Sequence, residues 1–146
     1  LERALDDAFA NLPAVPPADP VVALLSLFAA IYRVYEADER LAKAFVKEAL
    51  FAADVPSDRV GTDLAAWTFS FIARLGRVIE EWRSDGILGA HVDSPTAGFQ
   101  AFSHYYFALV SWLGSSAVTP EVRDSLLSAS LRQLMRGLGP HPGDEP

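Results

Sequence analysis

Apolar residues recur along the chain at spacings of three and four, the period of an amphipathic helix, in six separate stretches. The clearest stretch is the one that we expect to extend from Val55 to Ser84. Its apolar positions are separated by four, three, four, four, three and four residues: Val60, Leu64, Trp67, Phe71, Leu75, Val78 and Trp82. Polar and apolar residues nowhere alternate over a run long enough to predict a sheet. The pattern therefore predicts an all-α fold, a helical bundle of about six helices.

Cap residues and prolines mark where these helices begin. We expect helices over residues 1–12, 20–35, 39–53, 55–84, 95–113 and 120–136. Three of them start with a side chain that can cap the helix, followed by a proline that suits the first turn: Asp19-Pro20, Asp93-Ser94-Pro95 and Thr119-Pro120. Gly86 is placed to end the longest helix in the left-handed conformation. One domain over residues 1–138 is expected, followed by a disordered, proline- and glycine-rich tail over 139–146.

Large aromatic residues are concentrated on the apolar stripes. They can form an ordinary core, or they can line a cavity between widely spaced helices, as in many small-molecule sites. On the second interpretation we predict a ligand site formed by Tyr32, Tyr35, Trp67, Thr68, Phe71, Arg74, Phe99, Phe102 and Tyr106. Arg74, at the edge of its stripe, is the candidate partner of an anionic ligand; an arginine in this position more often extends to solvent or pairs with a carboxylate.

The last two helices carry apolar residues on two sides. In the helix over 95–113, one side has the expected core stripe: Phe99, Phe102, Tyr106, Leu109, Val110 and Leu113. In the last helix, Leu127, Leu131, Leu134 and Leu138 form the corresponding stripe. The remaining sides would expose a contiguous apolar patch in a monomer, and such patches usually mark interfaces. They consist of Ala97, Ala101, His104, Ala108, Trp112, Val122, Leu126 and Ala129.

This patch leads us to expect a homodimer. Two helices from each copy would form a four-helix bundle around a two-fold axis, and the small residues would let the helices approach closely. The alternative is that the tail or the first helix covers these faces within one chain.

Composition and charge limit the possible partners. The 146 residues suit one domain, and a hydrophobic content of 51% is too high for a disordered chain. With 12 Lys and Arg against 19 Asp and Glu, the net charge is −7 and no basic cluster occurs, so we expect this chain by itself not to bind DNA. The longest apolar run, Val21–Tyr32, is shorter than the roughly 20 residues that cross a bilayer, so no membrane association is expected.

Few residues offer catalytic or metal-binding chemistry. The chain has no cysteine, which excludes disulfides and thiolate sites and is consistent with the reducing cytoplasm that we expect as its location. His91, His104 and His141 lack metal-ligand spacing, and the adjacent Glu80 and Glu81 point in different directions around a helix. No glycine-rich phosphate loop or serine nucleophile motif is present. We therefore expect no catalytic residue, metal or cofactor, and no enzyme.

Four segments together resemble a known family. They are Asp19-Pro-Val-Val-Ala-Leu-Leu; Arg40-Leu-Ala-Lys-Ala-Phe-Val-Lys-Glu-Ala-Leu-Phe; Ser84-Asp-Gly-Ile-Leu before Val92-Asp-Ser-Pro; and Leu131-Arg-Gln-Leu-Met-Arg-Gly-Leu138. In their order and spacing they resemble the C-terminal ligand-binding and dimerisation domain of TetR-type transcription regulators, over about residues 1–138. The resemblance implies transcription regulation by a small-molecule effector. The family's N-terminal helix-turn-helix domain is not part of this sequence, so DNA binding is expected only through such a domain.

The resemblance also implies a mechanism. A ligand that enters between the long helix and its neighbours would shift the first helix, which in the family connects to the DNA-binding domain. Two other functions remain open at this point: a stand-alone helical module that binds an apolar small molecule, and a small all-α enzyme.

Overall fold

The computed structural model describes residues 2–12, 18–51 and 59–140, and within them it contains six helices and no strand. The helices are α1 (Glu2–Ala10), α2 (Pro20–Ala37), α3 (Glu39–Phe51), α4 (Arg59–Ser84), α5 (Ser94–Gly114) and α6 (Pro120–Leu138). The predicted all-α fold is thus confirmed. Most of the expected tail, residues 141–146, lies outside the described residues, and the dimeric bundle stays a prediction because it requires a second copy.

The three predicted cap-and-proline signals begin helices as expected. The Asp19 carboxylate accepts a hydrogen bond from the Val21 amide at 2.9 Å, and the Asp93 carboxylate accepts one from the Thr96 amide at 3.1 Å. The Thr119 hydroxyl does the same for Val122 at 3.4 Å. Each side chain satisfies a backbone donor that the first turn of a helix leaves free.

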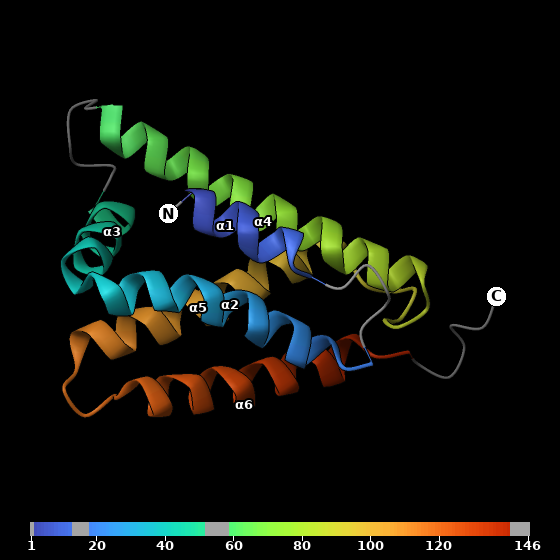
Figure 1. Ribbon diagram of the computed structural model, residues 1–146. Helices are drawn as coiled ribbons and strands as arrows, with labels where there is room; N and C mark the ends of the chain where they lie inside the picture. Colours follow the sequence, from blue (N-terminus) through green and yellow to red (C-terminus); the bar gives the residue numbers. More distant parts are fainter. Residues whose placement is uncertain (1, 13–17, 52–58, 141–146) are drawn as a thin grey trace.

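The helices form a bundle in which α2 is central (Figure 1). α4 packs along α5, and α5 packs along α6; α2 contacts α1, α3 and α6. In Figure 1, α1 lies along the middle of α4, and α2 crosses in front of α5. The short helix α3 lies at one end of the bundle, where it contacts α2, α4 and α5.

The described part of the predicted α4 stripe is directed mainly to the core: Phe71 and Leu75 are fully buried and Trp82 nearly so, while Trp67 and Val78 are half-buried. Ile79, beside the predicted stripe, is fully buried as well, and the side chains of Val60 and Leu64 lie outside the described residues. Eight residues of α2 are buried, which agrees with its almost uniformly apolar sequence. By length and composition α2 would also be able to cross a membrane, a property that buried core helices share with membrane spans.

The orientation of α5 differs only in part from the expectation, because Phe102 and Leu109 of the predicted core stripe are buried. Ala97, Ala101 and Ala108, predicted to face outward, are buried within the chain, whereas Phe99, predicted to face the core, is 57% exposed. The reason is the close approach of α4: a Cβ atom added at Gly98 would lie only 2.6 Å from the Gly76 nitrogen. Only the small-residue side of α5 permits this packing distance, so that side is turned inward.

Candidate functional site

Five aromatic side chains from α3, α4 and α5 form a closed circuit, which we call the five-ring cluster. Its members are Phe45, Trp67, Phe71, Phe102 and Tyr106. Neighbouring ring centroids around the circuit are 5.3, 5.4, 5.5, 5.9 and 6.4 Å apart. Four of these contacts are edge-to-face and the fifth, between Phe102 and Tyr106, is stacked, which are the favoured geometries for aromatic pairs.

The two half-buried members of the five-ring cluster carry its polar atoms. The indole nitrogen Nε1 of Trp67 is buried and has no hydrogen-bond partner within the described part of the chain. The Tyr106 hydroxyl donates a long hydrogen bond of 3.4 Å to the Val46 carbonyl, and burial raises its pKa. The cluster therefore combines an apolar wall with one unpaired donor and one weakly bonded hydroxyl.

Three buried tyrosines that are joined by hydrogen bonds, which we call the tyrosine chain, lie beside the cluster in the core. Tyr32 donates to the Tyr105 carbonyl at 2.8 Å, and the Tyr105 hydroxyl donates to that of Tyr35 at 3.5 Å. Tyr105 also makes ring contacts with Phe71 and Phe102, which connect the two groups. Burial raises the pKa of all three tyrosines well above the usual range, so these phenols stay protonated.

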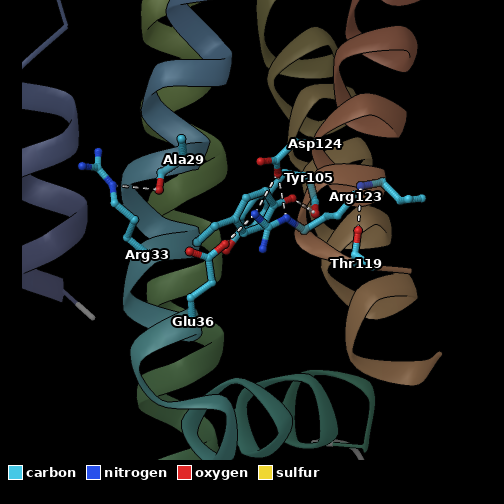
Figure 2. A network of polar contacts seen from close by, with 9 residues as sticks. Ala29, Arg33, Glu36, Tyr105, Thr119, Arg123 and Asp124 are labelled. Atoms are coloured by element: carbon cyan, nitrogen blue, oxygen red, sulfur yellow. Dashed lines mark hydrogen bonds and ion pairs between the residues drawn. The ribbon is translucent and has the colours of Figure 1, made fainter. Parts of the chain in front are cut away.

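Arg123 of α6 pairs with Glu36 of α2 and so joins the two helices (Figure 2). Its side chain is only 2% exposed, and its Nη2 atom lies 2.7 Å from a Glu36 carboxylate oxygen and 2.8 Å from one of Asp124. The guanidinium also stacks on the rings of Tyr32, at 4.0 Å, and Trp112, at 4.8 Å. Nη1 is buried without a partner in the described residues.

Arg74 connects α4 to α1. Its guanidinium lies 4.2 Å above the Phe9 ring and pairs with the Asp6 carboxylate at 2.6 Å. Phe9 in turn contacts Phe71 edge to face at 5.8 Å. Through Phe9, α1 is thus in direct contact with Phe71, a member of the five-ring cluster.

The predicted ligand residues separate into three groups. Trp67, Phe71, Phe102 and Tyr106 come together in the five-ring cluster, and Tyr32 and Tyr35 lie in the adjoining tyrosine chain. Thr68 is half-buried on α4. Phe99 and Arg74 lie elsewhere: Phe99 is exposed on the outer side of α5, and Arg74 faces α1.

Sequence reasoning left three residues out of the site. Phe45 and Tyr105 are aromatic residues on or beside apolar stripes, but the stripes do not show which rings meet. Arg123 had a usable signal, because it is four residues before Leu127 and so falls on the buried stripe of α6. A charged residue at such a position indicates a buried pair.

The predicted dimer interface is only partly available. Ala97, Ala101 and Ala108 are buried in their own chain, and His104 and Trp112 are half-buried; the interface itself stays a prediction. On α6, however, Val122 and Leu126 are 41% and 51% exposed, and Ala129 is exposed as well. On α5 the outward side carries Phe99 and Phe107, the latter 73% exposed.

Two surface grooves lie away from the five-ring cluster. One, of about 870 Å³, runs between α1 and α2 past Asp7, Asn11, Val22 and Arg33. The other, of about 760 Å³, lies where α4 meets α5, beside Phe69 and Gly76. Among the described residues no three His, Asp or Glu side chains are grouped as a metal site.

The fold and the cluster define a class, an all-helical bundle with an aromatic interior. No protein-family model matches the sequence, and no curated protein or solved structure does either.

Proposed function

We propose that this chain is the ligand-sensing and dimerisation domain of a TetR-type transcription regulator, and that it binds an apolar or aromatic small molecule at the five-ring cluster. DNA binding would belong to a helix-turn-helix domain that precedes α1, as it does in the family. The acidic charge of the chain is consistent with this division of roles.

One observation carries the proposal: α4 contacts both the candidate ligand site and α1. Phe71 and Trp67 on α4 are members of the five-ring cluster, while Arg74, one turn further along, holds Phe9 and Asp6 of α1. A ligand that separates the rings would move α4 and, through Arg74, the first helix. A sensor needs such a structural connection between its two sites.

Dimerisation is supported by the exposed apolar side chains of the last two helices, which contact each other. Phe99 and Phe107 lie eight residues apart on one side of α5, and Val122 and Leu126 lie four apart on α6. We propose that these residues, in place of the buried alanines, form the interface of a homodimer.

The ligand site is tested with the neutral fluorescent dye N-phenyl-1-naphthylamine. We expect saturable binding that Trp67→Ala weakens and Phe69→Ala leaves unchanged, because Phe69 lies on the same helix but is 72% exposed. The link to α1 is tested by hydrogen–deuterium exchange of the α1 amides with and without dye. Exchange should change on binding, and Arg74→Ala should bind dye but lose this response, whereas Arg77→Ala, an exposed arginine of α4, should keep it.

Saturable dye binding with unchanged exchange in α1 would refute the sensor and favour a stand-alone binding module. If the dye does not bind saturably, the five-ring cluster is only a core.

A further inference from the structure

The five-ring cluster consists mainly of hydrocarbon surface but also contains two polar atoms. Phe45, Phe71 and Phe102 are buried and present only hydrocarbon, while the half-buried Trp67 and Tyr106 bring one polar atom each. Rings contact one another edge to face around most of the circuit. A flat aromatic molecule can replace such contacts, because its faces and edges meet neighbouring rings in the same geometries.

The Trp67 indole is the site's free donor. An indole N–H can donate one hydrogen bond and accept none, so only an acceptor can satisfy it. Buried N–H groups are almost always bonded, yet Nε1 of Trp67 has no partner in the described residues. An acceptor atom on a bound molecule would satisfy this donor.

Tyr106 supplies a second, weaker polar group on the same rim. Its hydroxyl is directed to the Val46 carbonyl at 3.4 Å, near the limit of a hydrogen bond, and its ring is stacked on Phe102. Because burial raises its pKa, this group remains a neutral hydroxyl.

Among the described residues no cation stacks on a ring of the five-ring cluster. The contacts between arginines and rings in the described residues are on Phe9, Tyr32 and Trp112, all outside it. Arg74, which the sequence offered as partner for an anion, is paired with Asp6. An ionised ligand would thus lose its hydration without gaining an opposite charge.

We infer that the five-ring cluster selects a neutral, planar aromatic ligand carrying a hydrogen-bond acceptor, such as an aryl ketone, with the acceptor bonded to Trp67 Nε1. This inference rests on the proposed function, since it specifies the ligand class of the same site. Trp67 is the specificity-determining residue.

A matched series of naphthalene probes tests it by displacement of bound N-phenyl-1-naphthylamine. Naphthalene supplies the rings alone, 2-acetylnaphthalene adds a neutral acceptor, and 2-naphthoate adds an anionic one. We expect 2-acetylnaphthalene to bind about three- to tenfold more tightly than naphthalene, the gain of one net hydrogen bond. Naphthoate should bind more weakly than the ketone. Trp67→Phe should remove the ketone's advantage while Trp112→Phe, the same substitution outside the cluster, should keep it.

A second readout needs no variant at the site. The indole ¹H–¹⁵N resonances of the three tryptophans can be assigned with Trp82→Phe and Trp112→Phe. The resonance of Trp67 should move downfield with the ketone and not with naphthalene.

The outcomes separate the two claims. If none of the probes displaces the dye, the proposed ligand site itself fails. If naphthalene and the ketone bind equally and Trp67→Phe changes neither, the site stands but the acceptor inference is wrong. Tighter binding of naphthoate would overturn the neutral class.

Discussion

Arg123 shows how one side chain can join two helices in an apolar interior. Its charge is matched by Glu36 on α2 and by Asp124, and its flat guanidinium stacks between the rings of Tyr32 and Trp112. Such stacking and forked hydrogen bonding suit arginine better than lysine. The arrangement leaves Nη1 without a partner, which partly offsets its contribution to stability.

Replacing Arg123 with alanine should lower the free energy of unfolding by about 2–3 kcal/mol. The loss combines packing, ring stacking and an ion pair, and it is smaller than for a fully buried pair because both carboxylates are at least a third exposed. Urea unfolding at fixed protein concentration measures it. Arg132→Ala is the control, since that arginine is 52% exposed and 3.6 Å from Asp19, and it should cost less than about 0.5 kcal/mol. Equal stabilities of the two variants would contradict the role assigned to Arg123.

Glu80 connects the end of α4 with the start of α5. Its carboxylate accepts hydrogen bonds from Arg83 at 2.6 and 2.9 Å and from the buried Ser94 hydroxyl at 2.6 Å. These bonds, first from Arg83 and then from Ser94, lower the pKa of Glu80 from 4.5 to about 2.

The lowered pKa predicts a specific pH dependence. As the pH falls, Glu80 becomes protonated at a higher pH in the unfolded chain than in the folded one. The stabilisation from the ionised Glu80 carboxylate is therefore fully present above pH 4.5 and disappears toward about pH 2. Glu80→Gln should therefore be less stable than the unaltered chain at pH 7 and equal to it near pH 2, by urea midpoints at several pH values. Asp93 and Glu121, whose pKa values are also lowered, are present in both chains and cancel. A difference that does not change with pH would show that the carboxylate charge is not involved.

At the scale of the element, the contact between α4 and α5 depends on two glycines that are not equivalent. A Cβ at Gly98 would lie 2.6 and 2.8 Å from backbone atoms of Gly76, which cannot move aside. A Cβ at Gly76 would meet its nearest atoms at 3.5 Å, an ordinary contact distance.

Alanine substitutions at these glycines should therefore have opposite effects. Gly98→Ala should lower the free energy of unfolding by about 1–3 kcal/mol, because the helices must separate. Gly76→Ala should leave stability unchanged or raise it by up to about 1 kcal/mol, since alanine favours a helix more than glycine does. Thermal unfolding of both variants decides this, and similar melting temperatures would show that the helices are not held at this distance.

At the scale of the whole molecule, the exposed apolar residues of α5 and α6 determine the expected assembly. Phe107 is the most exposed of the large hydrophobic residues described, and Leu126 is half-exposed on the neighbouring helix. Exposed apolar groups of this kind are a feature of interfaces between subunits.

Light scattering should give a mass of twice 15.8 kDa for the unaltered chain. The double variant Phe107→Glu, Leu126→Glu should be a monomer that remains helical by circular dichroism, because both side chains are already at the surface. Val22→Glu, at a 52% exposed position of α2, is the control and should stay dimeric. Glutamates at Ala101 and Ala108 would not test the interface, because those positions are buried. A monomeric unaltered chain would remove the dimer from the proposal.

Much of this fold was readable in the sequence because its signals are local. The helix starts at Asp19, Asp93 and Thr119 depend on a side chain two or three residues from the amide that it caps. Gly86, predicted to end α4, has the positive φ of 75° that the left-handed turn requires. For α4, most of the large apolar residues recur on one side of the helix, so most of its buried face follows from the spacing.

The sequence by itself determined the helical class, most of the helix boundaries and the core face of α4, because each of these depends on neighbours within a few residues. The tertiary structure decided how α5 is turned: the close approach at Gly76 and Gly98 also buries the small-residue side, next to the buried Phe102, and leaves Phe99 exposed. It also decided which aromatic residues form the five-ring cluster, and that Arg74 faces α1. These outcomes depend on distances between segments far apart along the chain, and a pattern of spacings contains no such distances.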